Sequence, residues 1–125
     1  MPYEYEISPT QRLIRVRMWG SLTRAEVMAV VQELIADSRF TPGLSELIDL
    51  EDATSTAITA NDLRQLAASS LDPVARRAFV TTDALTFGLA RMFEAHREAS
   101  QAPERIAVFK NLRDAEAWLG LNEEQ

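Results

Sequence analysis

The chain has 125 residues, of which 46% are apolar and 26% charged, and it contains no cysteine. These figures are typical of one globular domain with its own core, and they exclude disorder, a disulfide framework, a thiolate nucleophile and a cysteine-ligated metal. The net charge of −6 repels nucleic-acid backbones and anionic lipid surfaces, so nucleic acid is not an expected partner.

The first residues predict a β-hairpin. Residues 3–7 and 12–19 alternate with a period of two, and Ser8-Pro9-Thr10-Gln11 between them is typical of a turn. Acidic residues share one face of the first strand, and arginines share one face of the second. Cross-strand ion pairs among Glu4, Glu6, Arg15 and Arg17 are one interpretation, and a solvated polar face, which we expect, is the other.

A helix is predicted over residues 24–37. Thr23-Arg24-Ala25-Glu26 has the pattern of a capping box, and Phe40-Thr41-Pro42-Gly43 lies beyond the end of the helical spacing. Apolar residues between these signals recur at the spacing of one helix face. The stripe that we expect to face the core consists of Val27, Met28, Val31, Leu34 and Ile35.

Three short apolar runs predict strands that are covered on both faces. They are Leu47-Ile48-Asp49-Leu50, Ala78-Phe79-Val80 and Ile106-Ala107-Val108-Phe109. Helical patterns separate and follow these runs, and Gln101-Ala102-Pro103 predicts a loop. The expected inward residues of the helices are Leu63, Leu66 and Ala67 after the Thr59–Asp62 box, Leu85, Leu89, Met92 and Phe93 after Asp83, and Ala115, Trp118 and Leu119 between a capping Asn111 and Gly120.

The predicted order is β-β-α-β-α-β-α-β-α, which places the chain in the α/β class. Right-handed crossovers between alternating strands and helices produce a parallel sheet, and the hairpin adds one antiparallel strand. We therefore expect a single domain over residues 1–125, with a core over about 3–120 and a mixed, mainly parallel five-stranded sheet flanked by helices. The start of the chain lacks a secretion signal, and no apolar stretch approaches 18 residues, so we expect a cytoplasmic protein without a membrane span.

The carboxyl ends of the predicted strands form the first candidate site, because ligands of open α/β sheets gather there. Its residues are Trp19, Asp49, Asp52, Thr54, Ser55, Thr56, Thr81, Thr82 and Lys110. Trp19 either lies beneath a helix or is exposed as an anchor for a partner. Carboxylates at Asp49, Glu51 and Asp52 either bind a hard cation or form a solvated acidic loop, and we expect the loop.

The second candidate site is an apolar pocket between helix 83–99 and the sheet. Gly88 lies on the predicted inner stripe, where glycine costs about 1 kcal/mol against alanine, so a backbone or a ligand is expected to approach it. The pocket residues are Gly88, Met92, Phe93 and His96. His96 is the only histidine, so it forms no histidine metal pair. The common nucleotide, zinc and hydrolase motifs are absent, and we expect no catalytic residue, metal or cofactor.

Two resemblances to known families bear on function. Asp49, Thr81 and Lys110 resemble the phosphoacceptor, hydroxyl and lysine of receiver domains, but Met18-Trp19-Gly20 offers none of the acidic ligands that receivers use for magnesium. The segment from Arg105 to Leu119 resembles the closing signature of the SpoIIAA-like family, an apolar strand ending in Phe followed by an acidic helix with Ala-x-x-Trp-Leu. The runs 47–50 and 77–80 resemble its central strands, and the likeness covers most of residues 12–119.

The SpoIIAA-like resemblance implies a fold related to STAS domains and compared with lipid-binding CRAL-TRIO domains, often in a dimer. True antagonists of this kind carry a phosphorylatable serine in an Asp-Ser-x-Gly-like turn, whereas Ala53–Ala60 has hydroxyls, Ser55 among them, but no Asp-Ser pair and no glycine. The leading hypothesis is a non-enzymatic regulatory module that binds a protein partner or itself through a helix and the loop after the third strand. The alternative is a binder of a small apolar or amphiphilic ligand in the pocket at helix 83–99, and a third is an enzyme built on Asp49 and Lys110.

Overall fold

The computed structural model describes residues 3–68, 74–101 and 104–121. Its elements in chain order are β1 (Tyr3–Ser8), β2 (Leu13–Met18), β3 (Gly20–Leu22), α1 (Arg24–Ala36), β4 (Ser45–Asp49), β5 (Ala53–Thr56), α2 (Ala60–Ala68), β6 (Arg76–Val80), α3 (Ala84–Ala99), β7 (Arg105–Phe109) and α4 (Leu112–Trp118). Every predicted helix and strand is present, and β3 and β5 are additional.

The main sheet has five strands in the order β1-β2-β4-β6-β7. β1 is antiparallel to β2, whereas β2, β4, β6 and β7 are parallel to one another, which confirms the predicted mixed, mainly parallel α/β fold. The parallel strands end at one edge of the sheet, because Arg17 is opposite Asp49, Asp49 opposite Val80 and Val80 opposite Phe109. The loops after these strands therefore meet along one rim.

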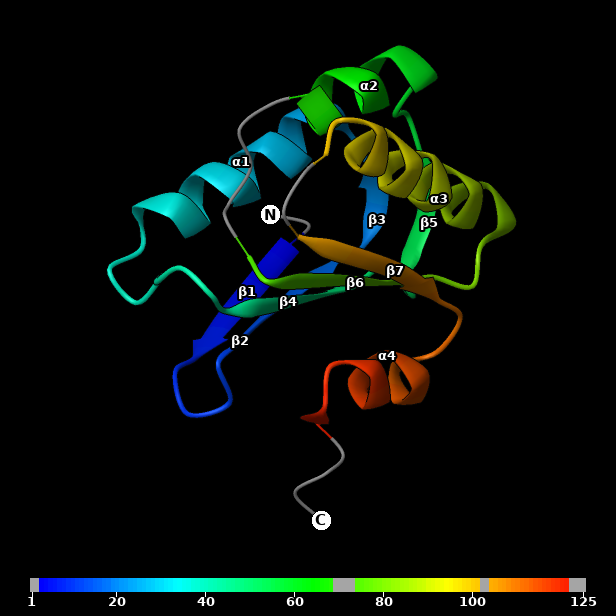
Figure 1. Ribbon diagram of the computed structural model, residues 1–125. Coiled ribbons are helices and arrows are strands. Elements are labelled where there is room, and N and C mark those ends of the chain that lie inside the picture. Colours follow the sequence, from blue (N-terminus) through cyan, green and yellow to red (C-terminus); the bar gives the residue numbers. More distant parts are fainter. Residues whose placement is uncertain (1–2, 69–73, 102–103, 122–125) are drawn as a thin grey trace.

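The two faces of the sheet are covered unequally (Figure 1): α1, α2 and α3 lie on one side and α4 on the other. Under α4, the fully buried Ala78 and Val80 pack against Ala115, and the Phe109 and Trp118 rings lie 5.7 Å apart. On the three-helix side, buried apolar residues of β1, β2 and α1 belong to the larger core cluster, and the partly buried Phe79 of β6 packs against it. Side chains alternate between these faces along each strand.

Helix caps follow the predicted signals. The Glu26 amide donates to Thr23 Oγ1 at 3.2 Å, and the Asp114 amide donates to Asn111 Oδ1 at 2.9 Å. At the start of α2, the Thr59 and Asp62 side chains each accept the other's amide at 3.0 Å. These bonds satisfy amides that the first turn of a helix leaves unpaired.

A second, two-stranded sheet was not predicted. β3 and β5 pair in parallel, and Gly20 N donates to Asp52 O at 3.1 Å while Ala57 N donates to Leu22 O at 2.8 Å. Both segments are short and mostly small or polar, so neither has the apolar run that identifies a strand. The expected loop at Ala53–Ala60 consequently begins with β5.

Two predicted helix stripes were partly wrong. Ile35 is 51% exposed on α1, and on α3 Leu85 and Met92 are 62% and 39% exposed. Phe93 of the predicted stripe is buried, and Thr86 and Ala90, which were not predicted to face the core, are buried as well. Thr86 is a polar residue in the core, and its hydroxyl donates to Asp83 Oδ2 at 2.8 Å, which removes most of the cost of burying it.

The arginines of the hairpin do not form the cross-strand ion pairs that were the alternative to a solvated face. Register places Glu4 opposite Arg17 and Glu6 opposite Arg15, yet Arg17 pairs with Asp52 at 2.7 Å and Arg15 with Glu116 of α4 at 3.1 Å. Carboxylates from the loop after β4 and from α4 thus bind the two arginines.

The predictions for β7 and for the loop 101–103 also have an outcome in the structure. β7 lies at an edge, and its apolar residues are only half-buried rather than covered on both faces. Of the predicted loop 101–103, Gln101 lies in a turn at φ +58°, whereas Ala102 and Pro103 lie outside the described residues, as does the Ala67 side chain. Among the helices described, none has the length and apolar character needed to cross a bilayer.

Candidate functional site

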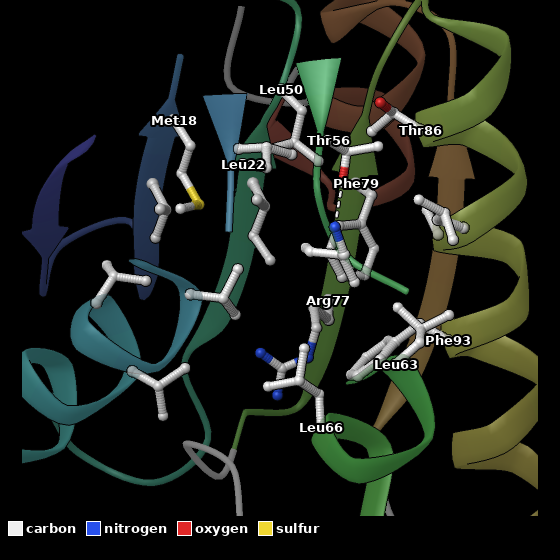
Figure 2. Close-up of a pocket in the computed structure, with 18 of the residues that line it drawn as sticks. Met18, Leu22, Leu50, Thr56, Leu63, Leu66, Arg77, Phe79, Thr86 and Phe93 are labelled. Atoms are coloured by element: carbon white, nitrogen blue, oxygen red, sulfur yellow. Dashed lines mark hydrogen bonds between the residues drawn. The ribbon is translucent and has the colours of Figure 1, made fainter. Parts of the chain in front are cut away.

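An apolar cavity lies between the sheet and its three helices. Its volume is about 120 Å³. Figure 2 shows Met18 of β2, Phe79 of β6 and Phe93 of α3 converging on it. The remaining wall includes Leu22, Val30, Val31, Ile48, Leu50, Leu63, Leu66, Leu89 and Ala90. The cavity is therefore built by elements from most of the chain rather than by one motif.

The placement of the helices explains the space. α1 and α3 supply opposite walls, and α2 contributes Leu63 and Leu66, which are 5% and 4% exposed and pack with Phe93. Phe79 and Phe93 meet edge to face at 5.7 Å, which fixes two of the larger rings of the wall. At one end, Leu22 of β3 and Thr56 of β5 face the cavity in Figure 2, so the unpredicted second sheet is part of the site.

A buried ion pair forms part of the wall. Glu46 and Arg77 are opposite each other on β4 and β6, each is 3% exposed, and an Arg77 Nη1 hydrogen bond joins them. Arg77 Nη2 also lies 3.4 Å from Glu104 Oε2. Glu104 in turn accepts from Arg97 at 2.8 and 3.0 Å. The four side chains, which we call the charge cluster, contain two carboxylates and two guanidiniums.

The pKa of Glu104 reflects this setting. Burial by itself raises the pKa, but the Arg97 hydrogen bonds and the nearby charges of Arg77 and Arg97 lower it overall. Glu104 is consequently ionised at neutral pH. The charge cluster contributes no net charge to the cavity when all four groups are ionised.

The other polar side chains of the cavity wall are threonines that bind the protein itself. Thr56 Oγ1 accepts from the Ile58 amide at 3.2 Å, a bond drawn in Figure 2. Thr86 Oγ1 donates to Asp83 Oδ2. Both hydroxyls are therefore engaged within the protein.

The structure places the four predicted pocket residues in different surroundings. Phe93 lines the cavity, whereas Met92 points outward and His96 is half-buried away from the cavity wall. The expectation that another backbone or a ligand approaches Gly88 is wrong, because apart from its chain neighbours and the nearby backbone of its own helix, no atom lies within 4 Å of a Cβ placed there. The helix was predicted correctly, but its rotation about its axis was not.

The predicted rim residues do follow the parallel strands, but they divide into separate groups. Arg17 stacks over Trp19 with its guanidinium carbon 4.7 Å from the ring centroid, and it also binds Asp52. Trp19 is half-buried, so neither of its two predicted settings holds completely. Thr54 and Ser55 are exposed on β5, and Thr56 faces the cavity.

The remaining rim residues have local contacts. Asp49 Oδ1 accepts from the Glu51 amide at 2.9 Å, and Thr81, which is fully buried, accepts from the Asp83 amide at 3.3 Å. Thr82 is exposed. Lys110 lies over the Phe87 ring at 5.6 Å, and β6 separates its strand from that of Asp49. Each of the two side chains thus has a contact of its own, and no ion pair joins Asp49 to Lys110, both of which the structure describes.

The acidic residues Asp49, Glu51 and Asp52 were expected to form a solvated loop, with a cation site as the alternative. Burial raises the pKa of Glu51, and the charges of Asp49 and Asp52 raise it further. Among the residues that the structure describes, no group of three histidine or acidic side chains is placed to hold a metal ion.

Sequence reasoning missed Glu46 and Arg77. A usable signal was present, because in strands of period two Glu46 shares a face with Ile48 and Arg77 shares one with Phe79. Opposite charges on one buried face of neighbouring strands indicate an ion pair.

Comparisons with known proteins agree on fold alone. No family model and no curated protein matches the sequence. Among solved structures, the chain is similar to an uncharacterised protein of the DUF3478 family from Shewanella loihica PV-4, described as having a SpoIIAA-like fold. The two share 20% identity at a TM-score of 0.59, over 94% of this chain and 93% of that one. The predicted SpoIIAA-like fold is thereby confirmed.

Proposed function

We propose that this chain is a non-enzymatic, cytoplasmic binding module that holds a small apolar ligand between α3 and the sheet. The observation that carries the proposal is the apolar cavity of about 120 Å³ behind Phe79 and Phe93. A dry apolar cavity of about 150 Å³ suffices to bind benzene in another protein, so a ring or a short branched chain is of the right size.

A non-catalytic role is supported by how the polar groups are used. Asp49 is held in a local turn, and Lys110 lies over an aromatic ring. Neither residue lines the cavity, and each is engaged in a contact of its own. Binding, rather than turnover, is what the wall of the cavity can provide.

The direct test is titration of ¹⁵N-labelled protein with toluene, followed by amide chemical shifts. We expect saturable shifts for residues of β4, β6 and α3 that surround the cavity. Ala90→Leu fills the cavity from α3 and should abolish them, because Ala90 lines it and is 7% exposed. Ala95→Leu adds the same atoms on the exposed face of the same helix and should leave binding intact. Absence of saturable shifts in the wild-type protein would refute the proposal.

A second candidate, supported by a different observation, is association through the rim with a protein partner or a second copy. Arg17 over Trp19, fixed by Asp52, forms a flat cationic and aromatic surface of the kind that anchors interfaces. Ser55 and Thr54 lie exposed on the adjoining β5.

Sedimentation equilibrium over a range of concentrations tests self-association. If two copies meet at the rim, Trp19→Ala should shift the protein toward monomer, and Leu85→Ala on exposed α3 should not. A wild-type protein that stays monomeric would remove the homodimer and leave only a different protein as partner.

A further inference from the structure

We infer that the cavity selects neutral molecules and rejects anions of the same size, because the charge cluster already neutralises each charge in its wall. This inference rests on the proposed function. It goes further by assigning the chemical class of the ligand, an uncharged aromatic or branched aliphatic molecule rather than a carboxylate such as a fatty acid.

The four side chains of the charge cluster form ion pairs with one another. Glu46 and Arg77 bind each other across neighbouring strands, and Glu104 bridges Arg77 to Arg97. Their side chains are between 3% and 14% exposed, so water screens them little. Separating such a buried ion pair is costly, because it would leave a desolvated charge without its partner.

A carboxylate ligand would bind in this cavity less favourably than a neutral ligand of the same shape. To take the hydrogen bond of Arg77 Nη1 it would have to displace Glu46, and otherwise it would share a guanidinium whose charge Glu46 and Glu104 already offset. Desolvating an ion without a partner is far more costly than desolvating a neutral group of equal shape. Neutral ligands avoid this penalty and gain contact with the apolar wall.

Of the two hydroxyls in the wall, that of Thr86 favours the same ligand class. Thr56 accepts a backbone bond, and Thr86 donates to the Asp83 side chain. Thr86 uses its proton on Asp83 and offers none to a ligand carboxylate, whereas Thr56 only accepts a bond and keeps its proton. One hydroxyl proton does not neutralise a desolvated carboxylate. Recognition in this cavity rests on shape and apolar contact.

The test compares three probes on the intact chain: toluene, nitrobenzene and benzoate. Nitrobenzene and benzoate have nearly the same shape and differ in charge, so their affinity ratio isolates the effect of charge. We expect nitrobenzene to bind at least tenfold more tightly than benzoate. Equal affinity of the two would overturn the inference and leave the proposed function standing, and failure of all three would refute the proposed function itself. Binding of toluene alone would also overturn it, since size and not charge would then set the limit.

A variant tests the cause. Glu46→Gln removes one carboxylate, keeps the shape and leaves the cavity with a net positive charge at Arg77. We expect benzoate to gain at least tenfold in affinity while toluene changes less than threefold. Should circular dichroism show that Glu46→Gln is unfolded, Glu104→Gln makes the same change in net charge from β7's side of the cluster. Unchanged discrimination in a folded variant would contradict the assignment of selectivity to the charge cluster.

Discussion

The helices on the two sides of the sheet are packed against it differently. Under α4, small residues pack together, and Ala78, Val80 and Ala115 have no exposed surface. On the other side three helices share the sheet, and their larger side chains leave a cavity above β4 and β6. Charges follow the same division, because Glu46 and Arg77 are buried under the helices whereas Arg15 remains 38% exposed beyond α4. A single helix can fit a sheet closely, but several helices around one centre leave room for a ligand.

The largest expected effect tests the difference in charge burial. Arg77→Met should lower the free energy of unfolding by about 3–5 kcal/mol, because it removes the guanidinium that the buried Glu46 binds. Arg15→Met, on the α4 side, should change it by less than about 1 kcal/mol. Urea denaturation of both variants measures the contrast.

A double variant controls for packing. Glu46→Leu combined with Arg77→Met replaces both charges by apolar groups and should recover much of the lost stability, since apolar replacement of a whole pair is often neutral. If the single and double variants were equally unstable, the loss would come from packing and not from an uncompensated charge.

The next effect tests the difference in free volume. Ala115→Leu overfills the close packing under α4 and should cost about 1–3 kcal/mol. Ala90→Leu makes the same change on the cavity side and should cost less than about 1 kcal/mol, because the added atoms enter existing space. Thermal unfolding of the pair compares them directly, and equal costs would argue against the cavity.

A smaller expected effect tests whether the helices on the two sides of the sheet open independently when one of them loses its cap. Asn111→Ala removes the cap of α4 and should cost about 1 kcal/mol. Hydrogen exchange should then speed up in α4 and leave α1 and α3 protected. Thr23→Ala, which removes the cap of α1, is the matched control and should show the opposite pattern. Identical exchange in both variants would mean that the two sides open together.

The smallest expected effect is on the free energy of unfolding in acid. The pKa of Glu104 is lower in the folded protein than its usual value of 4.5, so its contribution to stability is complete above 4.5 and is lost as the pH falls through the folded pKa. Glu104→Gln should therefore flatten the decline of unfolding free energy in acid. Parallel curves for the two proteins would show that other carboxylates govern the acid response.

Local signals made most of the fold predictable. Caps at Thr23 and Asn111 and the apolar runs of β4, β6 and β7 each depend on neighbours in sequence, and all are present. The pairing of β3 with β5 depends on residues some 30 positions apart, and their short polar sequences give no sign of it.

The candidate site was predicted less well for a related reason. Leu85 and Met92 form one helical stripe and Thr86, Ala90 and Phe93 another, and only the tertiary packing decides which stripe turns inward. The cavity itself comes from the spacing of three helices, which periodicity does not encode. Glu46 and Arg77 could have been found by combining strand alternation with register.

β1 forms one outer boundary of the five-stranded sheet, and its exposed acidic pair has a consequence for solubility. If two molecules joined β1 to β1 in antiparallel fashion around Tyr5, Glu4 of each would stand directly across from Glu6 of the other. Like charges facing each other across strands oppose such pairing, and charged edges are a common defence against aggregation. The hairpin that begins the chain thus also guards the sheet against uncontrolled extension into fibres.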